Sequence, residues 1–454
     1  MSSLFSKKKN QTSRMTEGSE VKLLLRFMLP LLMGNIFQQI YTMVDSIVVG
    51  RFVSSVALGS VGTVSSITFL FLSLCIGLSG GVNVLVAQYF GAGKTANVKQ
   101  AIGNAVYVTL LTGMTMSILA ITLARPILHL MQVPEANFAD ALLYMRITCG
   151  ATIVTAIYNT SSQIMCALGD TKTPLICVSV SSVINVVLDL VFVAAFHWGV
   201  SGAAWATVIS WITATIGAVV IPLRKNEYYQ LTGLDLVFSP RIVKKIIRMG
   251  IPLALQNAMG SISGVITQGI VNTFGSTVMS AYTACGRVEQ ILVQPYGTLG
   301  VSMASFSAQN IGAGKYDRVR SACRKSIFMV EGFTIAVTAV CFCFGRIFIG
   351  MFLTDSTMIE IGYRGLLIIA VSYFATGLVF VFKAMLNGAG DTAFTMFSGI
   401  IEIAARVVFL WVLISIPTVG IWGIWITAIL SGITAAVLCF ARYRQGKWKQ
   451  RAVI

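Results

Sequence analysis

The chain has 454 residues and a formal net charge of +17, with 56% hydrophobic and 11% charged residues, whereas about 25% of the residues in a soluble globular chain are charged. No charged residue occurs between Arg51 and Lys94 or between Arg248 and Arg287, and each gap exceeds the roughly 20 apolar residues that cross a bilayer. This composition excludes a soluble globular protein and predicts an integral membrane protein.

The residues up to position 20 are polar and offer no apolar segment followed by a small-residue cleavage site, so we expect no removable signal peptide. Beyond them, apolar runs separated by Gly, Pro and charged residues predict an all-α fold of twelve transmembrane helices. The predicted spans are 22–48, 56–88, 100–124, 138–166, 173–196, 199–222, 243–273, 277–308, 321–345, 359–387, 393–416 and 420–442.

Basic residues set the expected orientation, because cytoplasmic loops of membrane proteins are enriched in Lys and Arg. With the N-terminus inside, most of the 33 basic residues fall on the cytoplasmic side. We therefore expect both termini in the cytoplasm, a place in the plasma (cell inner) membrane, and no nucleic-acid partner for the positive charge. The expected segments are an N-terminal arm (1–21), an N-terminal lobe (22–222), a cytoplasmic linker (223–242), a C-terminal lobe (243–443) and a cytoplasmic tail (444–454).

The two lobes are predicted to be copies of one six-helix unit. Gln88-Tyr-Phe-Gly-Ala-Gly-Lys94 recurs as Gln309-Asn-Ile-Gly-Ala-Gly-Lys315, and Ala167-Leu-Gly-Asp-Thr171 recurs as Gly388-Ala-Gly-Asp-Thr392, both at an offset of 221. An even number of spans per copy gives both copies the same orientation, related by a pseudo-twofold axis along the membrane normal. Each Gly-Ala-Gly is expected to form a tight helix-to-loop turn with left-handed glycine geometry.

The nine cysteines are scattered, mostly in apolar runs, and form no C-x-x-C pair. Zinc and redox sites commonly use such pairs. We therefore interpret the cysteines as small apolar packing residues, and we expect no resident cofactor.

Two further motifs make the chain similar to a known family. Pro30 is followed by Val44-Asp-Ser-Ile-Val-Val-Gly50 in the first helix, and Gly169-Asp-Thr-Lys-Thr-Pro174 precedes the fifth. Together with the two Gly-Ala-Gly-Lys turns, they resemble the multidrug and toxic compound extrusion (MATE) family over nearly the whole chain. The basic motif expected after the second helix of a major facilitator transporter is absent from the sequence.

Ionisable residues inside a membrane span are costly and mark functional positions. Asp45 lies in the first predicted helix and Asp189 in the fifth, with Asn185 one helical turn earlier on the same face. The family resemblance implies a cation-coupling site at Asp45, Asn185, Asp189 and Thr207, in which Asp45 and Asp189 bind H⁺ or Na⁺. The alternative is that Asp45 caps its helix and Asp189 bonds to a backbone group.

The resemblance further implies an antiporter that exports amphipathic, often cationic, drugs by alternating access. We also expect the chain to act as a monomer. A lipid or lipid-linked oligosaccharide flippase of the same superfamily is the alternative. A membrane-embedded enzyme would need clustered His, Asp or Cys ligands or a Ser/Lys dyad at helical spacing, and the sequence offers neither. We therefore expect a transporter and not an enzyme.

The C-terminal lobe lacks the acid pair, because Asp189 and Asn185 correspond to Leu410 and Arg406 at the offset of 221. Glu402 and Arg406 have i, i+4 spacing and predict an intrahelical ion pair. Glu289 either binds a cationic drug or pairs with a nearby basic residue, Arg287 or Lys383. The candidate substrate-binding residues are Gln38, Tyr41, Asn83, Gln163, Gln256, Asn257 and Glu289.

Overall fold

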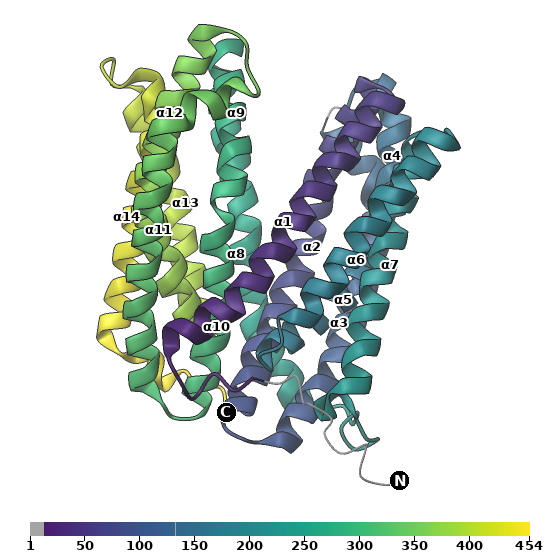
Figure 1. Cartoon of the computed structure of the whole chain (residues 1–454), viewed down its shortest axis with the longest axis vertical. Helices are drawn as coiled ribbons and strands as arrows, with labels where there is room; N and C mark the ends of the chain where they lie inside the picture. The colour runs from purple at the N-terminus through teal and green to yellow at the C-terminus, as the bar shows by residue number, and fades with distance from the viewer. Residues whose placement is uncertain (1–12, 132) are drawn as a thin grey trace. The chain divides into compact units, whose positions relative to one another are not determined.

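The computed structural model describes residues 13–131 and 133–454, and this part of the chain is helical without any β-strand (Figure 1). Most of the predicted arm (1–21), with its lysines at positions 7 to 9, lies outside the described residues. Lipid offers the backbone no hydrogen-bond partner, so continuous helices are the expected solution for such apolar runs. The helices are α1 (Glu20–Phe52), α2 (Ser55–Gly91), α3 (Thr95–Leu130), α4 (Glu135–Gly150), α5 (Thr152–Ala167), α6 (Lys172–Asp189), α7 (Gly199–Lys225), α8 (Pro240–Asn272), α9 (Ser276–Leu292), α10 (Gln294–Gly312), α11 (Tyr316–Gly350), α12 (Ser356–Gly388), α13 (Thr392–Ile414) and α14 (Gly423–Gln445).

Nine of the described helices or helix pairs are long and apolar enough to cross a membrane, or ten if the bent pair α4 and α5 counts as one span. This pair bends by 42° at the break around Ala151. The α9 and α10 helices likewise divide the predicted span 277–308, with the break at Val293 just before Pro295. Proline has no backbone N–H to donate, so it is tolerated in the first turn of the new helix.

The chain forms two compact units. The first contains Leu29–Ala254 and the described residues before Met15, and the second contains Met15–Met28 and Leu255–Val453. In the first unit α2 packs against α3, α4 and α5, while α7 packs against α4, α5 and α6. In the second unit α12 is central and packs against α9, α10, α11 and α14, and α13 packs against α14.

The sequence repeat has a structural counterpart in each unit. Helices α2 and α10 end at Gly91 and Gly312, which are 221 residues apart. Gly93 and Gly314 then adopt the same left-handed conformation, with φ of +71° in both. A residue with a Cβ is disfavoured there, which explains why glycine occupies this position in both copies.

The first turns of α1 and α8 each lie in the other unit from the one expected from the repeat. The repeat assigns α1 to the first unit and α8 to the second. Residues 15–28, here called the first strap, precede the membrane part of α1 but lie in the second unit. Residues 235–254, the second strap, include the start of α8 but lie in the first unit. The boundaries fall beside Pro30 and Pro252, where each helix loses a backbone hydrogen-bond donor.

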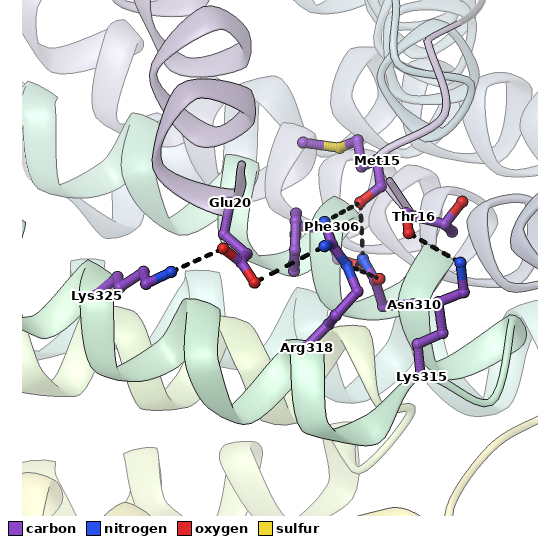
Figure 2. A network of polar contacts seen from close by, with 8 residues as sticks. All are labelled: Met15, Thr16, Glu20, Phe306, Asn310, Lys315, Arg318 and Lys325. Atoms are coloured by element: carbon purple, nitrogen blue, oxygen red, sulfur yellow. Dashed lines mark hydrogen bonds and ion pairs between the residues drawn. The ribbon is translucent and has the colours of Figure 1, made fainter. Parts of the chain in front are cut away.

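Polar contacts hold the first strap on α10 and α11 (Figure 2). The Met15 backbone N–H donates to Gln309 Oε1 at 2.8 Å, and Asn310 Nδ2 donates to the Met15 carbonyl at 3.1 Å. Glu20 Oε2 pairs with Lys325 Nζ at 2.8 Å, and Glu20 Oε1 lies 3.8 Å from a guanidinium nitrogen of Arg318. The strap is therefore fixed by both backbone and side-chain groups.

The second strap is held on α2 and α3 in a related way. The Ser239 N–H donates to Asn104 Oδ1 at 2.7 Å, and Lys245 Nζ donates to Tyr89 Oη at 3.2 Å. A Cβ added to Gly103 would lie 2.2 Å from the Asp235 carbonyl oxygen, so the backbones approach as closely as only glycine permits. Asn104 and Lys325 are 221 residues apart, so equivalent positions of the repeat contact the two straps.

Candidate functional site

Helix α1 carries Asp45 into the apolar interior of the first unit. The Asp45 side chain is 7% exposed, and its neighbours Val48 and Val49 belong to a buried cluster formed with residues of α2, α3, α4 and α7. Asp45 lies well before the end of α1 at Phe52. It therefore does not cap this helix, which was the alternative interpretation from sequence.

Helix α6 carries Asn185 and Asp189 on one face, and both side chains are fully buried. Directly after Asp189 the backbone changes from an α-helix to a π-helical segment, η1 (Leu190–Ala195). Such segments are rare and occur frequently at functional sites. In the second unit the equivalent helix α13 continues as an α-helix through Leu410, the counterpart of Asp189, so the irregularity accompanies the acid.

Helices α7 and α4 complete the site. Thr207 of α7 is 7% exposed and Tyr144 of α4 is 6% exposed. The Tyr144 side chain lies close enough to Thr207, Asp45 and Asp189 for electrostatic interaction with them. The structure therefore brings together all four residues of the expected cation site and adds Tyr144. No spacing pattern in the sequence marks this tyrosine, because a buried aromatic residue in a membrane helix is most simply interpreted as packing.

The two carboxyl groups lie close enough to each other to interact electrostatically. Both oxygens of Asp189, one oxygen of Asp45 and both polar atoms of Asn185 are buried without a hydrogen-bond partner among the described residues. Asp189 thus makes no bond to a backbone group, and neither acid has an ion pair with a described basic residue.

Such an arrangement is unfavourable if both acids carry a bare negative charge. Burial penalises each charged carboxylate, and two adjacent carboxylates repel. A proton or a cation relieves both effects. The site also offers the amide oxygen of Asn185 and the hydroxyl of Thr207, and carboxylate, amide and hydroxyl oxygens are ligands that hard cations prefer. No group of three or more His, Cys, Asp or Glu with metal-binding geometry occurs in the described part of the chain.

The other polar candidates of the first unit fall in two places. Asn83 Nδ2 donates to the Gln163 carbonyl at 2.9 Å, so these two residues lie together between α2 and α5. Tyr41 lies one turn before Asp45 on α1 and interacts with it electrostatically. Gln38 is exposed and interacts with Tyr41.

The remaining candidates belong to the second unit. Gln256 Nε2 donates to the Thr395 carbonyl at 3.5 Å, and Asn387 Nδ2 donates to Gln256 Oε1 at 3.4 Å. Asn257 and Glu289 are half-buried. These residues show where polar groups occur in this unit, but their role in substrate binding stays a prediction.

The predicted ion pair between Glu402 and Arg406 is wrong. Glu402 Oε2 instead pairs with Lys383 Nζ of α12 at 2.8 Å. The i, i+4 spacing permits a pair within α13 but does not exclude a competing base on a neighbouring helix. Lys383 is therefore occupied by Glu402, and Glu289 forms no ion pair with Lys383 or Arg287 among the described residues.

The cysteines are free, as expected, and eight of the nine are buried. Most lie at helix contacts; Cys285 Sγ, for example, donates to the Gly362 carbonyl at 3.0 Å. This placement agrees with a packing role.

Comparison with known proteins adds family membership. The MatE family model matches residues 30–191 and 252–412. The probable multidrug resistance protein YoeA of Bacillus subtilis is 27% identical over 454 residues, covering 97% of both chains. The probable multidrug resistance protein NorM of Thermotoga maritima is 25% identical over 439 residues, covering 95% of this chain and 94% of that protein.

Solved structures have the same fold. An outward-facing multidrug resistance MATE family transporter of the MOP superfamily superposes with a TM-score of 0.91 at 22% identity, covering 98% of this chain and 100% of that one. A MATE protein in a bent conformation superposes with a TM-score of 0.90 at 21% identity. The expected all-α membrane fold in two six-helix halves is thereby confirmed. The ten apolar spans, together with α8 and the broken pair α9 and α10, make up the twelve. The two segments that match the family model correspond to the two copies of the repeat. This chain belongs to the MatE family of multi-pass membrane transporters and is not an enzyme.

Proposed function

We propose that the protein is a cation-coupled antiporter that exports amphipathic, often cationic, organic compounds by opening alternately to the two sides of the membrane. The observation that carries the proposal is the pair formed by Asp45 and Asp189, buried together without a basic partner among the described residues. Multidrug resistance proteins among the relatives support organic compounds as the substrate class.

The coupling follows from electrostatics. With a proton or Na⁺ bound, the acid pair loses most of its mutual repulsion, so α1 and α6 can stay close together around it. Without the cation, the pair favours separation or hydration. A conformational change driven this way requires the cation to bind the two states with different affinity, and a site assembled from α1, α4, α6 and α7 changes its geometry whenever one of these helices moves.

The test is dye efflux from proteoliposomes under an imposed pH or Na⁺ gradient. We expect efflux to follow one of the two gradients, and Asp45→Asn or Asp189→Asn to slow gradient-driven efflux by about 10-fold or more, since a charge-assisted interaction is worth about 1.5–3 kcal/mol. Glu135→Gln, which alters an exposed acid of the same unit, is the matched control and should leave efflux unchanged.

Two results would contradict the proposal. Full gradient-driven transport by both Asn variants would remove the acid pair from the coupling mechanism. Transport by the wild type that needs neither gradient would remove antiport itself.

A further inference from the structure

The linker between the two copies of the repeat carries a short exposed apolar segment just before α8. Four of the five residues at 234–238 are apolar, and Val237 and Phe238 are each 55% exposed. The fifth is Asp235, whose carboxylate accepts hydrogen bonds from the Thr232 backbone N–H and hydroxyl at 2.8 and 2.7 Å. Single exposed apolar side chains are common, but a contiguous run of them marks an interaction surface.

Contacts with α3 place this segment at the edge of the membrane. Tyr107 Oη donates to the Leu236 carbonyl at 2.8 Å, and the rings of Tyr107 and Phe238 meet edge to face with their centroids 5.8 Å apart. No charged residue occurs in α3 between Lys99 and Arg125. The helix rises about 27 Å from Tyr107 to Arg125, close to the hydrocarbon thickness of about 30 Å. Tyr107 thus lies at one membrane boundary, where tyrosine is enriched, and Phe238 lies beside it.

The face of α3 that continues from Tyr107 toward Arg125 is apolar. Leu111, Met114 and Ile118 are exposed, and their spacing places them on the same side of the helix as Tyr107. An exposed apolar face of a membrane-spanning helix is solvated by lipid chains. The apolar segment of the linker is therefore held beside a lipid-facing surface of the first unit.

The first turns of α8 add exposed positive charge directly after the apolar segment. Arg241, Lys244 and Arg248 are exposed, and their i, i+3 and i+7 spacing places them on one face of the helix. None of the three forms an ion pair with an acid in the described part of the chain. Ile251, one turn further on this face, is exposed and apolar. The face therefore changes from charged to apolar as the helix leaves the linker.

The first strap offers the same charges without the apolar segment. Lys22 and Arg26 are exposed and precede the proline of α1 by eight and four residues, which is the spacing of Lys244 and Arg248 before the proline of α8. The residues at 17–19, ahead of Lys22, are exposed and contain no apolar side chain. The molecule thus contains its own control for the effect of the apolar residues.

We propose that the second strap is a binding surface for acidic phospholipids of the adjacent leaflet. Val237 and Phe238 enter the boundary between headgroups and acyl chains, while Arg241, Lys244 and Arg248 contact the negatively charged headgroups. A lipid fits this surface better than a soluble acidic protein does, because the apolar part lies at the level of the hydrocarbon boundary. The surface is separate from the acid pair and does not depend on the proposed export function.

The test uses the full-length protein with the fluorophore NBD attached at Val237→Cys in a Cys343→Ser background, reconstituted in vesicles. Vesicles of phosphatidylcholine alone are compared with vesicles that contain increasing amounts of phosphatidylglycerol. We expect phosphatidylglycerol to shift the NBD emission to shorter wavelength and to increase its quenching by nitroxide-labelled lipid. The same fluorophore at Glu17→Cys in the first strap, where the side chain is exposed, should stay in water in all vesicles.

Charge variants test the headgroup contact separately from the apolar one. Arg241→Gln and Lys244→Gln should each raise the phosphatidylglycerol content needed for half of the emission shift by about two- to fivefold, because each basic residue near an acidic membrane surface adds to the attraction. Lys94→Gln is the matched control. This residue is exposed and precedes Tyr107 by about 20 Å along α3, so its loss should leave the lipid dependence unchanged.

Three results would overturn the proposal. The first is an emission at position 237 that does not respond to phosphatidylglycerol, and the second is an equal effect of Lys94→Gln and Arg241→Gln. The third is an equal shift produced by inorganic phosphate in phosphatidylcholine vesicles, since the basic face would then bind free phosphate and not lipid. None of these measurements requires transport, so a failure of the export function would leave their outcome unchanged.

Discussion

At the scale of single residues, Tyr144 is the neighbour of the acid pair that can be tested most directly. Asp45, Asp189 and Thr207 come from three different helices, and Tyr144 interacts with all of them from a fourth. Its hydroxyl can donate to a carboxylate and accept from Thr207. Under the proposed coupling, Tyr144 would link the position of α4 to the protonation or cation occupancy of the acid pair on α1 and α6.

Tyr144→Phe should preserve the packing of the ring and remove only the hydroxyl. We expect gradient-driven efflux to fall by about 10-fold if the hydroxyl bonds to a charged acid during the transport cycle, because such a hydrogen bond is worth about 1.5–3 kcal/mol, while the melting temperature changes little. Efflux from proteoliposomes and thermal unfolding in detergent measure the two quantities. Tyr158→Phe, at a tyrosine on α5 of the same unit, is the control, and an equal loss in both variants would remove the special role of Tyr144.

A second residue-scale prediction concerns Gly103 of α3. Its added Cβ would lie 2.2 Å from the Asp235 carbonyl oxygen and 3.0 Å from the carbonyl carbon, and backbone cannot move aside as a flexible side chain can. Gly103→Ala should therefore destabilise the docking of the second strap by about 1–3 kcal/mol. Faster proteolysis within residues 226–239 is the expected readout. Gly233→Ala, where nothing lies within 4 Å of the added Cβ, should leave the proteolysis rate unchanged.

At the scale of helices, the sequence predicted the bounds that depend on the length of an apolar run. Span 199–222 became α7 (Gly199–Lys225) and span 359–387 became α12 (Ser356–Gly388), because charges, Gly and Pro mark where an apolar run leaves the membrane. The break at Ala151 and the π-segment after Asp189 were not predicted. Both lie inside unbroken apolar runs, and side-chain polarity carries no information on whether the local hydrogen bonds are α or π.

The candidate site was likewise predicted only in part. Spacing and family resemblance identified Asp45, Asn185, Asp189 and Thr207, because these residues differ in chemistry from their apolar surroundings. Tyr144 and the true partner of Glu402 depend on which helices are neighbours in space. One chain read by itself does not contain that information.

The first strap gives an element-scale prediction about Arg318. Its Nε donates to Asn310 Oδ1 at 3.2 Å, and its guanidinium also contacts Glu20 and the Met15 carbonyl (Figure 2). Arg318→Gln should weaken the strap by about 1–2 kcal/mol and accelerate amide hydrogen exchange in residues 15–24. The matched control is Arg320→Gln, since Arg320 has only a 4.0 Å pair with the fully exposed Asp317. Unchanged exchange in the Arg318 variant would show that the backbone contacts suffice.

At the scale of the whole molecule, the distribution of basic residues predicts its orientation. Glu135 should face outside and Gly233 should face the cytoplasm if both termini are inside. Single cysteines introduced at these positions, in a Cys343→Ser background that removes the one exposed native thiol of the described chain, can be treated in intact cells with a membrane-impermeant maleimide. We expect labelling at position 135 and none at position 233 until the membrane is opened. The reverse pattern would invert the topology.

The placement of the two straps bears on how such a molecule arose. Each compact unit contains, in its own core, a stretch of chain that the repeat assigns to the other copy. In a lone six-helix ancestor, the surface of the second and third helices that now binds a strap would have been empty. The strap at its own N-terminal end would have had no surface to bind. Two ancestral chains could satisfy both by exchanging ends, as in a domain-swapped homodimer. A gene fusion would make such an exchange of ends permanent within one polypeptide.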